Sequence, residues 1–317
     1  MTPTNRQISL VFPGQGSQAV GMGRALAAGY PAARAVFEEV DDALGQPLSR
    51  LMWDGPADEL TLTANAQPAL MAHSVAAFRA LEAEGLALGE VASLAGHSLG
   101  EYSAHCVAGT YGLADTARLL RVRGEAMQAA VAPGEGAMAA ILGLDLDAVR
   151  AVAAAAASGG EVVEAANDND PGQVVVSGHR AAVERAAEIA RDRGAKRAVL
   201  LPVSAPFHCA LMEPAARAMA EALDDVDLRD PVVPLIANVE AGPVQDAGTI
   251  RSLLVEQVTG AVRWRESVAR MAADGVTEVW EIGAGKALSG MVRRIDRALA
   301  TRQVGTPAEV AEAAAAL

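Results

Sequence analysis

The alternation of apolar runs and amphipathic stretches along the chain predicts an α/β protein. Two short apolar runs, residues 8–12 and 91–95, have the length of buried strands, and each ends at a glycine-containing turn. Residues 67–84 and 113–131 instead repeat their apolar positions about every 3.6 residues, which is typical of helices. Strands that alternate with helices form parallel sheets, and such sheets carry functional loops at the carboxyl ends of their strands.

Residues 133–203 follow a different pattern. The predicted strands in this segment are 137–142, 162–166, 173–176 and 198–201, and the predicted helices are 146–157 and 181–193. The order βαββαβ is typical of a ferredoxin-like unit, and Pro133-Gly134 and Pro202 mark its two ends. We therefore expect a large domain of residues 1–132 and 204–317, and a small ferredoxin-like subdomain of residues 133–203 inserted into it.

Composition narrows the classes of function. The 317 residues are 51% hydrophobic and carry a formal net charge of −13, which fits a large core and disfavours a nucleic-acid surface built from clustered Lys and Arg. No apolar stretch approaches the length of a membrane span. Two cysteines give neither a disulfide framework nor a zinc-ligand set. We expect a cytoplasmic protein with free thiols, no metal, and no membrane or nucleic-acid partner.

A five-residue motif indicates a nucleophilic serine. Residues 96–100, Gly-His-Ser-Leu-Gly, match the GxSxG elbow, in which a strand turns sharply into a helix and exposes the serine hydroxyl. The context agrees, because an apolar run precedes the motif and a helical pattern, residues 101–107, follows it. The motif predicts that Ser98 is the nucleophile of an acyl-transfer or hydrolysis reaction. A glycine-rich turn with an incidental serine is the alternative.

A serine nucleophile needs a base, and histidine has a suitable pKa. His208 lies in an irregular, proline-punctuated segment after the last predicted strand of the insertion, where catalytic side chains often lie. We expect structural roles for the other histidines, which are His73, His97, His105 and His179. The group that orients the His208 ring stays open between an acid, such as Asp168 or Asp170, and a backbone carbonyl.

Arg123 falls on the apolar face of the predicted helix 113–131, together with Leu120 and Met127. A guanidinium is always charged and costly to bury alone, so an inward Arg123 needs a carboxylate. That carboxylate belongs either to the protein or to a ligand. In the second case the planar guanidinium would bind it through two hydrogen bonds, and the substrate would carry a free acid group. The alternative to a paired Arg123 is a side chain that lies along the apolar face and places its charged end in solvent.

A glycine-rich loop, residues 14–19, follows the first predicted strand and fits two functions. Its Gly-x-Gly-x-x-Ala spacing matches a relaxed dinucleotide-binding fingerprint. That fingerprint also requires a second strand, whereas residues 31–44 have a helical pattern. The backbone amides of such a loop can instead donate hydrogen bonds to an oxyanion beside a nucleophilic serine, and we favour this interpretation.

Several stretches spread over the chain carry a family resemblance. They are 12–18 (FPGQGSQ), 66–69 (AQPA), 96–102 (GHSLGEY), 123–128 (RGEAMQ), 171–174 (PGQV), 208–212 (HCALM) and 281–286 (EIGAGK). On these motifs the chain resembles the malonyl-CoA:acyl carrier protein transacylase family of bacterial type II fatty-acid synthesis. The resemblance covers nearly the whole chain. It implies an α/β-hydrolase-like large domain with the ferredoxin-like insertion, and transfer of malonyl from malonyl-CoA to the phosphopantetheine thiol of acyl carrier protein.

The resemblance also implies catalytic roles. Ser98 matches the acylated nucleophile and His208 its base, in a ping-pong mechanism that passes through a malonyl-serine intermediate. Gln257 matches the position whose backbone carbonyl orients the histidine, which would replace a third carboxylate. The backbone amides of Gln15 and Leu99 match the oxyanion donors.

Three further residues are implied to contact the acyl group. Arg123 matches the residue that binds the malonyl carboxylate, and Gln67 matches a pocket residue. Phe207 departs from the small residue that many bacterial members carry directly before the histidine, and is similar in this to malonyl-selective polyketide extender domains. Its ring should crowd a 2-methyl branch, and one methyl group in a pocket is worth about 1–3 kcal/mol.

The resemblance implies two partners and no resident cofactor. Coenzyme A enters as a thioester substrate, and phosphopantetheine arrives on acyl carrier protein. Carrier protein is acidic, so the basic cluster Arg293, Arg294 and Arg297 is the first candidate docking site, and the cluster in residues 191–197 is the second. We expect a monomer. A serine thioesterase or hydrolase, which would pass the acyl group to water, is the alternative function.

Overall fold

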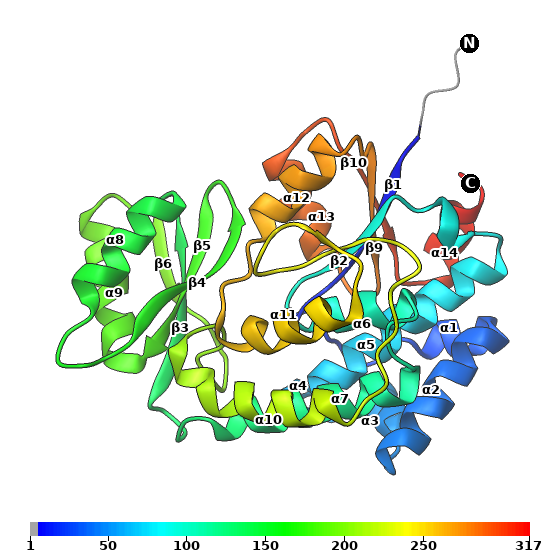
Figure 1. Ribbon diagram of the computed structural model, residues 1–317, viewed down its shortest axis with the longest axis horizontal. Helices are drawn as coiled ribbons and strands as arrows, with labels where there is room; N and C mark the ends of the chain where they lie inside the picture. Colours follow the sequence, from blue (N-terminus) through cyan, green and yellow to red (C-terminus); the bar gives the residue numbers. More distant parts are fainter. Residues whose placement is uncertain (1–5) are drawn as a thin grey trace.

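The computed structural model describes residues 6–317, which form two β-sheets covered by helices (Figure 1). The large sheet has the strand order β10-β9-β1-β2-β7-β8. Its strands are β1 (Ile8–Phe12), β2 (Ser93–Gly96), β7 (Leu235–Ile236), β8 (Pro243–Val244), β9 (Glu278–Ile282) and β10 (Ala300–Val304). Neighbouring strands from β10 to β7 run parallel, and β8 pairs antiparallel with β7. The predicted α/β class with a parallel sheet is confirmed.

Helices cover both faces of the large sheet, which explains why every residue of β1 is buried. Leu10 and Phe12 pack into one core, whereas Val11 points to the opposite face and packs into a second core with Trp264. The helices of this part are α1 (Arg24–Gly29), α2 (Pro31–Leu44), α3 (Leu48–Asp54), α4 (Ala57–Thr61), α5 (Thr63–Ala83), α6 (Leu99–Val107), α7 (Leu113–Ala129), α10 (Glu213–Asp224), α11 (Ala247–Thr259), α12 (Trp264–Ala273), α13 (Ala287–Ile295) and α14 (Pro307–Ala314), with short 3₁₀ turns at Leu88–Glu90 and Ala210–Met212. None of the helices in residues 6–317 is long and apolar enough to cross a membrane.

The small sheet is antiparallel and has the order β4-β5-β3-β6. Its elements are β3 (Gly136–Leu142), α8 (Leu146–Ala156), β4 (Val163–Asp170), β5 (Gln173–His179), α9 (Arg180–Asp192) and β6 (Arg197–Leu200). They follow the predicted βαββαβ order, and α8 and α9 share a separate apolar core with one face of the sheet. The proposed domain boundaries at 132/133 and 203/204 fall just outside these elements, and residues 1–5 of the first segment lie outside the described residues.

Strand β4 extends four residues beyond the predicted 162–166, through a polar segment that the sequence pattern did not mark as a strand. These polar residues are buried because each has a partner in the large part of the molecule. Asp168 pairs with Arg265 at 2.8 Å, and Asp170 pairs with Arg294 at 2.7 Å. Asn167 forms a β-bridge with Val262, just before α12. The segment therefore attaches the small sheet to α12, α13 and the residues just before α12, beside the candidate site.

Candidate active site

Ser98 lies at the sharp turn between β2 and α6, as the motif predicted. Its φ of 54° and ψ of −112° place it in a backbone conformation that residues with side chains rarely adopt. A Cβ on Gly96 would lie 1.9 Å from the carbonyl carbon of Gly100, and a Cβ on Gly100 would lie 2.2 Å from the carbonyl oxygen of Phe12. Both glycines are therefore required sterically, because strand, turn and helix approach one another too closely for any side chain.

Asn238 holds this strained turn in place. Its side-chain oxygen accepts a hydrogen bond from the Ser98 amide at 2.8 Å, and its side-chain nitrogen donates to the Gly96 carbonyl at 2.7 Å. The residue is buried. Sequence reasoning missed Asn238, because it follows a strand of only two residues and belongs to no recognised motif. The available signal was its position at the carboxyl end of β7, the neighbour of β2.

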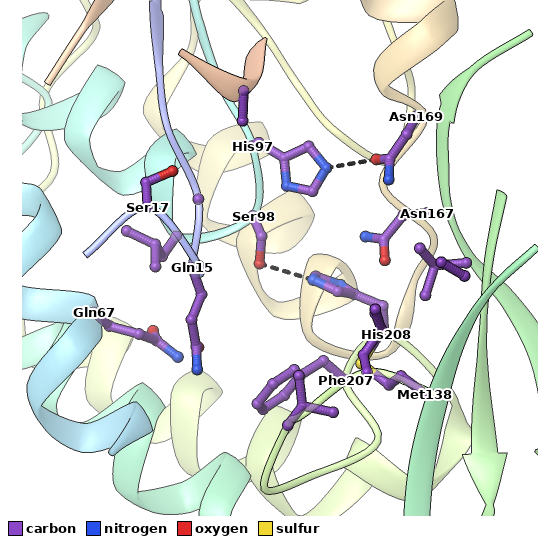
Figure 2. Close-up of a pocket in the computed structure, with 18 of the residues that line it drawn as sticks. Gln15, Ser17, Gln67, His97, Ser98, Met138, Asn167, Asn169, Phe207 and His208 are labelled. Carbon is purple, nitrogen blue, oxygen red and sulfur yellow. Dashed lines mark hydrogen bonds between the residues drawn. The ribbon is translucent and has the colours of Figure 1, made fainter. Parts of the chain in front are cut away.

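The structure brings Ser98 and His208 together from distant parts of the chain (Figure 2). Ser98 Oγ lies 2.7 Å from His208 Nε2. On the other side of the ring, Nδ1 lies 2.9 Å from the Gln257 carbonyl oxygen and 3.1 Å from that of Gly260. Because carbonyls only accept, Nδ1 carries the proton and Nε2 is free to accept the proton of the serine hydroxyl.

The acidic alternative for orienting the ring is wrong. Asp168 and Asp170, which the sequence left open for this role, bond instead to Arg265 and Arg294. Two backbone carbonyls contact Nδ1 of His208 in their place, one of them from the residue that the family resemblance indicated.

The buried environment of His208 keeps its imidazole neutral. Burial, reinforced by the positive charge of Arg123, lowers the pKa of its imidazole to about 3, against hydrogen bonds to the Gln257 and Gly260 carbonyls that favour the charged form. The ring therefore stays unprotonated at neutral pH. A neutral imidazole with Nε2 facing a hydroxyl is the form that general-base chemistry needs.

Arg123 lies fully inside, as its place on the apolar face of the helix predicted, with 1% of its surface exposed. Nη1 donates to Gln67 Oε1 at 2.8 Å, and Nη2 donates to Gln257 Oε1 at 2.8 Å and to Ser98 Oγ at 3.1 Å. Its Nε is buried without a partner. Within residues 6–317 no carboxylate oxygen lies within 4.0 Å of the guanidinium, so the internal ion pair that the sequence left open does not form.

A cavity of about 450 Å³ opens at these residues, between the large part and the small sheet. Gln15 and Leu99, the predicted oxyanion donors, both line it, and within the described chain neither backbone amide donates a hydrogen bond. Gln67 and Phe207 line it as well, with Phe207 directly beside the Ser98–His208 pair (Figure 2). The cavity thus combines a serine hydroxyl, a neutral imidazole, free backbone amides and a guanidinium.

Comparison with known proteins identifies the family. A malonyl CoA-acyl carrier protein transacylase of Escherichia coli (strain K12) is 47% identical to this chain over 308 residues, which are 97% of this chain and 98% of the relative. The chain belongs to the malonyl-CoA:acyl carrier protein transacylase family. The family model described as "Acyl transferase domain" agrees and matches residues 9–311.

Solved structures of the transacylase family share the whole fold. The crystal structure of an acyl-carrier-protein-S-malonyltransferase from Bartonella henselae has a TM-score of 0.95 and 56% identity, over 98% of this chain and 99% of that one. A malonyl-transacylase solved in complex with a type II PKS acyl-carrier protein also has a TM-score of 0.95, with 41% identity over 98% of this chain and 100% of that one.

The two basic clusters of this transacylase-family chain differ in their distance from the cavity. Met291 of α13 lines the cavity, and the cluster Arg293, Arg294 and Arg297 lies on or just after the same helix with exposed side chains. Arg293 also donates to Thr301, and Arg294 bonds Asp170. The second cluster, residues 191–197, lies at the end of α9, on the outer side of the small sheet (Figure 1).

His97 and His73 contact neutral partners, whereas His105 Nε2 lies 4.0 Å from the Glu101 carboxylate. His97 Nε2 lies 2.9 Å from Asn169 Oδ1, and the ring packs against Trp264. His73 bonds the Gly305 carbonyl. His97 lines the cavity but points away from the nucleophile toward β4 (Figure 2). These contacts fit the structural roles that the sequence predicted for them.

Proposed function

We propose that this chain transfers a malonyl group from malonyl-CoA to the phosphopantetheine thiol of acyl carrier protein, through a malonyl-serine at Ser98. One observation carries the proposal. A buried Arg123, with no carboxylate in contact, donates a hydrogen bond to the hydroxyl that His208 would activate. A short acyl chain on Ser98 that ends in a carboxylate would therefore meet a guanidinium, and malonyl is the short diacid acyl group that the named relatives transfer.

In the first half-reaction His208 Nε2 takes the Ser98 proton while Oγ attacks the thioester carbonyl of malonyl-CoA. The amides of Gln15 and Leu99 donate to the oxyanion that forms. Collapse breaks the carbon–sulfur bond, and the coenzyme A thiolate leaves with the proton from His208. The neutral state of His208, set by burial and by Arg123, makes it ready for this proton.

In the second half-reaction the carrier's phosphopantetheine thiol enters the cavity that coenzyme A has left. His208 takes the thiol proton, and the thiolate attacks the malonyl-serine ester. The ester bond to Ser98 breaks, and the serine oxygen regains its proton from His208. The same oxyanion donors serve both steps, so the cycle is ping-pong and needs no group beyond those of the chain and its two substrates.

The cluster Arg293, Arg294 and Arg297 is the proposed docking site for the acidic carrier, because it adjoins the cavity mouth on α13. Exposed charges act mainly on the rate of association. Arg297→Glu should therefore raise KM for the carrier, more strongly at low salt, and leave acylation by malonyl-CoA unchanged. Arg193→Glu, in the remote cluster, is the matched control. An equal effect of both variants would contradict this docking site.

The proposal includes a monomeric, cytoplasmic chain without a resident cofactor. Light scattering coupled to size exclusion measures the first property, fractionation of the source cells the second, and native mass spectrometry of the purified chain the third. A stable dimer, a membrane-bound or exported pool, or a non-protein mass would contradict the respective part.

The direct test mixes the protein with malonyl-CoA and holo carrier protein and follows both products. We expect malonyl carrier to form much faster than free malonate. Dominant release of malonate would contradict the transferase and indicate the hydrolase alternative. Omitting the carrier should leave one equivalent of coenzyme A released and little turnover, because water would not replace the thiol efficiently.

A further inference from the structure

Glu101 is a buried carboxylate that the mechanism above does not use. It lies in the first turn of α6, directly after the nucleophile motif, and is 1% exposed. Its Oε2 accepts hydrogen bonds from Gln257 Nε2 at 2.7 Å and from the Asn238 amide at 3.2 Å. Burial raises the pKa of Glu101 to about 7, although both hydrogen bonds and the charge of Arg123 favour the ionised form. In mildly alkaline solution this carboxylate is therefore charged.

Gln257 connects this carboxylate to Arg123. Its amide nitrogen donates to Glu101 and also to the Ser98 carbonyl at 3.0 Å, and its amide oxygen accepts from Arg123 Nη2 at 2.8 Å. If the Gln257 amide were turned over, its nitrogen would lie against the guanidinium and its oxygen against the carboxylate. Both contacts would be repulsive, because two donors would meet in one and two acceptors in the other. A cation at one end and an anion at the other thus fix the amide in one orientation.

The amide separates two charges that would otherwise form a direct ion pair. A carboxylate in contact with Arg123 would occupy the donors that a ligand carboxylate needs. Gln67 and Gln257 instead offer neutral amide oxygens, which are weaker acceptors than a carboxylate and can give way to one. The negative charge of Glu101 thus balances the positive charge of Arg123 without touching it, and a ligand carboxylate can replace the two amide oxygens that Arg123 contacts.

We propose that Glu101 is the relayed counter-ion of Arg123, a positioning residue that sets through Gln257 how strongly this arginine binds an acyl carboxylate. The inference rests on the proposed function, since it requires a substrate with a free acid. The negative charge of Glu101 stabilises the empty cationic site and opposes a second carboxylate. Like charges about 10 Å apart at an effective dielectric constant near 20 repel enough to change binding roughly tenfold. Neutral Glu101 should therefore strengthen carboxylate binding.

The test uses the full chain carrying Ser98→Ala, which cannot be acylated. Isothermal titration in low-chloride buffer at pH 8.5 gives dissociation constants for acetyl-CoA and for malonyl-CoA. Their ratio isolates the carboxylate, because the two ligands share every other group. Adding Glu101→Gln should raise the preference for malonyl-CoA about tenfold. Glu281→Gln is the matched control: Glu281 is also a fully buried carboxylate, but it accepts from the Leu288 and Ser289 amides.

The control should leave the ratio unchanged. An unchanged or lower preference in the Glu101→Gln chain would overturn the relay. A Ser98→Ala chain that does not prefer malonyl-CoA at all would instead overturn the proposed function, so the two failures are distinguishable. Arg123→Ala in the same background should bring the ratio close to one, and a retained preference there would overturn the relay too.

A second measurement covers the case in which Glu101→Gln does not fold. The same ratio is measured on the Ser98→Ala chain at pH 6 and at pH 8.5. The charged and titratable groups around Glu101 are Arg123 of α7, Tyr102 and His105 of its own helix, and Tyr111 after that helix. Burial lowers the pKa of His105 to about 3 and raises that of Tyr102 to about 12, and it raises the pKa of Tyr111 as well.

None of these neighbours changes its charge between pH 8.5 and pH 6, whereas Glu101 takes up a proton as the pH falls over this range. The preference for malonyl-CoA should therefore increase several-fold toward pH 6. A ratio that stays flat or decreases would overturn the relay.

Discussion

Replacing Arg123 with alanine should change the acyl group that the protein prefers. In the proposed complex the guanidinium meets the malonyl carboxylate inside a cavity, where a charge without a partner is costly. Removing one member of a buried ion pair costs about 3–5 kcal/mol, which corresponds to a loss of roughly 10²- to nearly 10⁴-fold in kcat/KM for malonyl-CoA. Acetyl-CoA has no carboxylate to leave unpaired, so its transfer should change by about tenfold or less.

The same substitution has a separate cost for stability. It leaves the side-chain oxygens of Gln67 and Gln257 without their donor, and each unpaired buried acceptor costs about 1–3 kcal/mol unless water enters. Thermal unfolding therefore has to accompany the kinetics, so that assays are run where the variant is folded.

The assay compares kcat/KM for malonyl-CoA and acetyl-CoA with one holo carrier protein. Arg121→Ala is the matched control: this arginine lies on the same helix but donates to Asn65 Oδ1 at 2.7 Å, away from the nucleophile. The control should keep the wild-type preference for malonyl. Equal losses for both acyl groups in Arg123→Ala would refute the reasoning and show that the arginine only supports the fold.

Three further predictions follow from the site. Burial lowers the pKa of His208 to about 3 in the folded chain, so as the pH falls below about 6.5 only the unfolded chain takes up a proton at this residue. From pH 7 to pH 5 the free energy of unfolding of the wild type should therefore fall by about 2 kcal/mol more than that of His208→Asn, as measured by chemical denaturation. A difference that stays constant with pH would contradict a buried neutral ring. Phe207→Ser should raise methylmalonyl transfer relative to malonyl by roughly 10- to 100-fold in competition assays, and an unchanged ratio would remove Phe207 from specificity. Gly100→Ala, whose Cβ would meet the Phe12 carbonyl, should lower the unfolding temperature strongly, whereas Gly89→Ala, which has open space, should not.

The sequence predicted those parts of the molecule in which periodicity and burial agree. Residues 8–12 were predicted as a buried strand and match β1 at both ends, because helices cover both faces of the sheet. Arg123 was placed inward from the 3.6-residue repeat alone, and it is buried. The GxSxG pattern predicted the elbow at Ser98 because sterics leave only glycine on either side of it.

The sequence could not predict contacts that depend on tertiary neighbours. Gln257 lies 156 positions from Glu101, and no local pattern connects them. Asp168 and Asp170 lie outside the predicted strands and were considered for the ring of His208. Arginines from α12 and α13 make a buried polar strand possible there. Backbone carbonyls leave no compositional trace, so the contact to the imidazole could only be proposed by resemblance.

The most direct test of the central claim is the intact mass of the protein before and after a carrier chase. Brief exposure to malonyl-CoA should add the mass of one malonyl group to wild type and nothing to Ser98→Ala, and peptide mapping should place the group on Ser98. Holo carrier protein should then remove it and gain the same mass. No adduct on wild type, or an adduct that only water removes, would contradict the account.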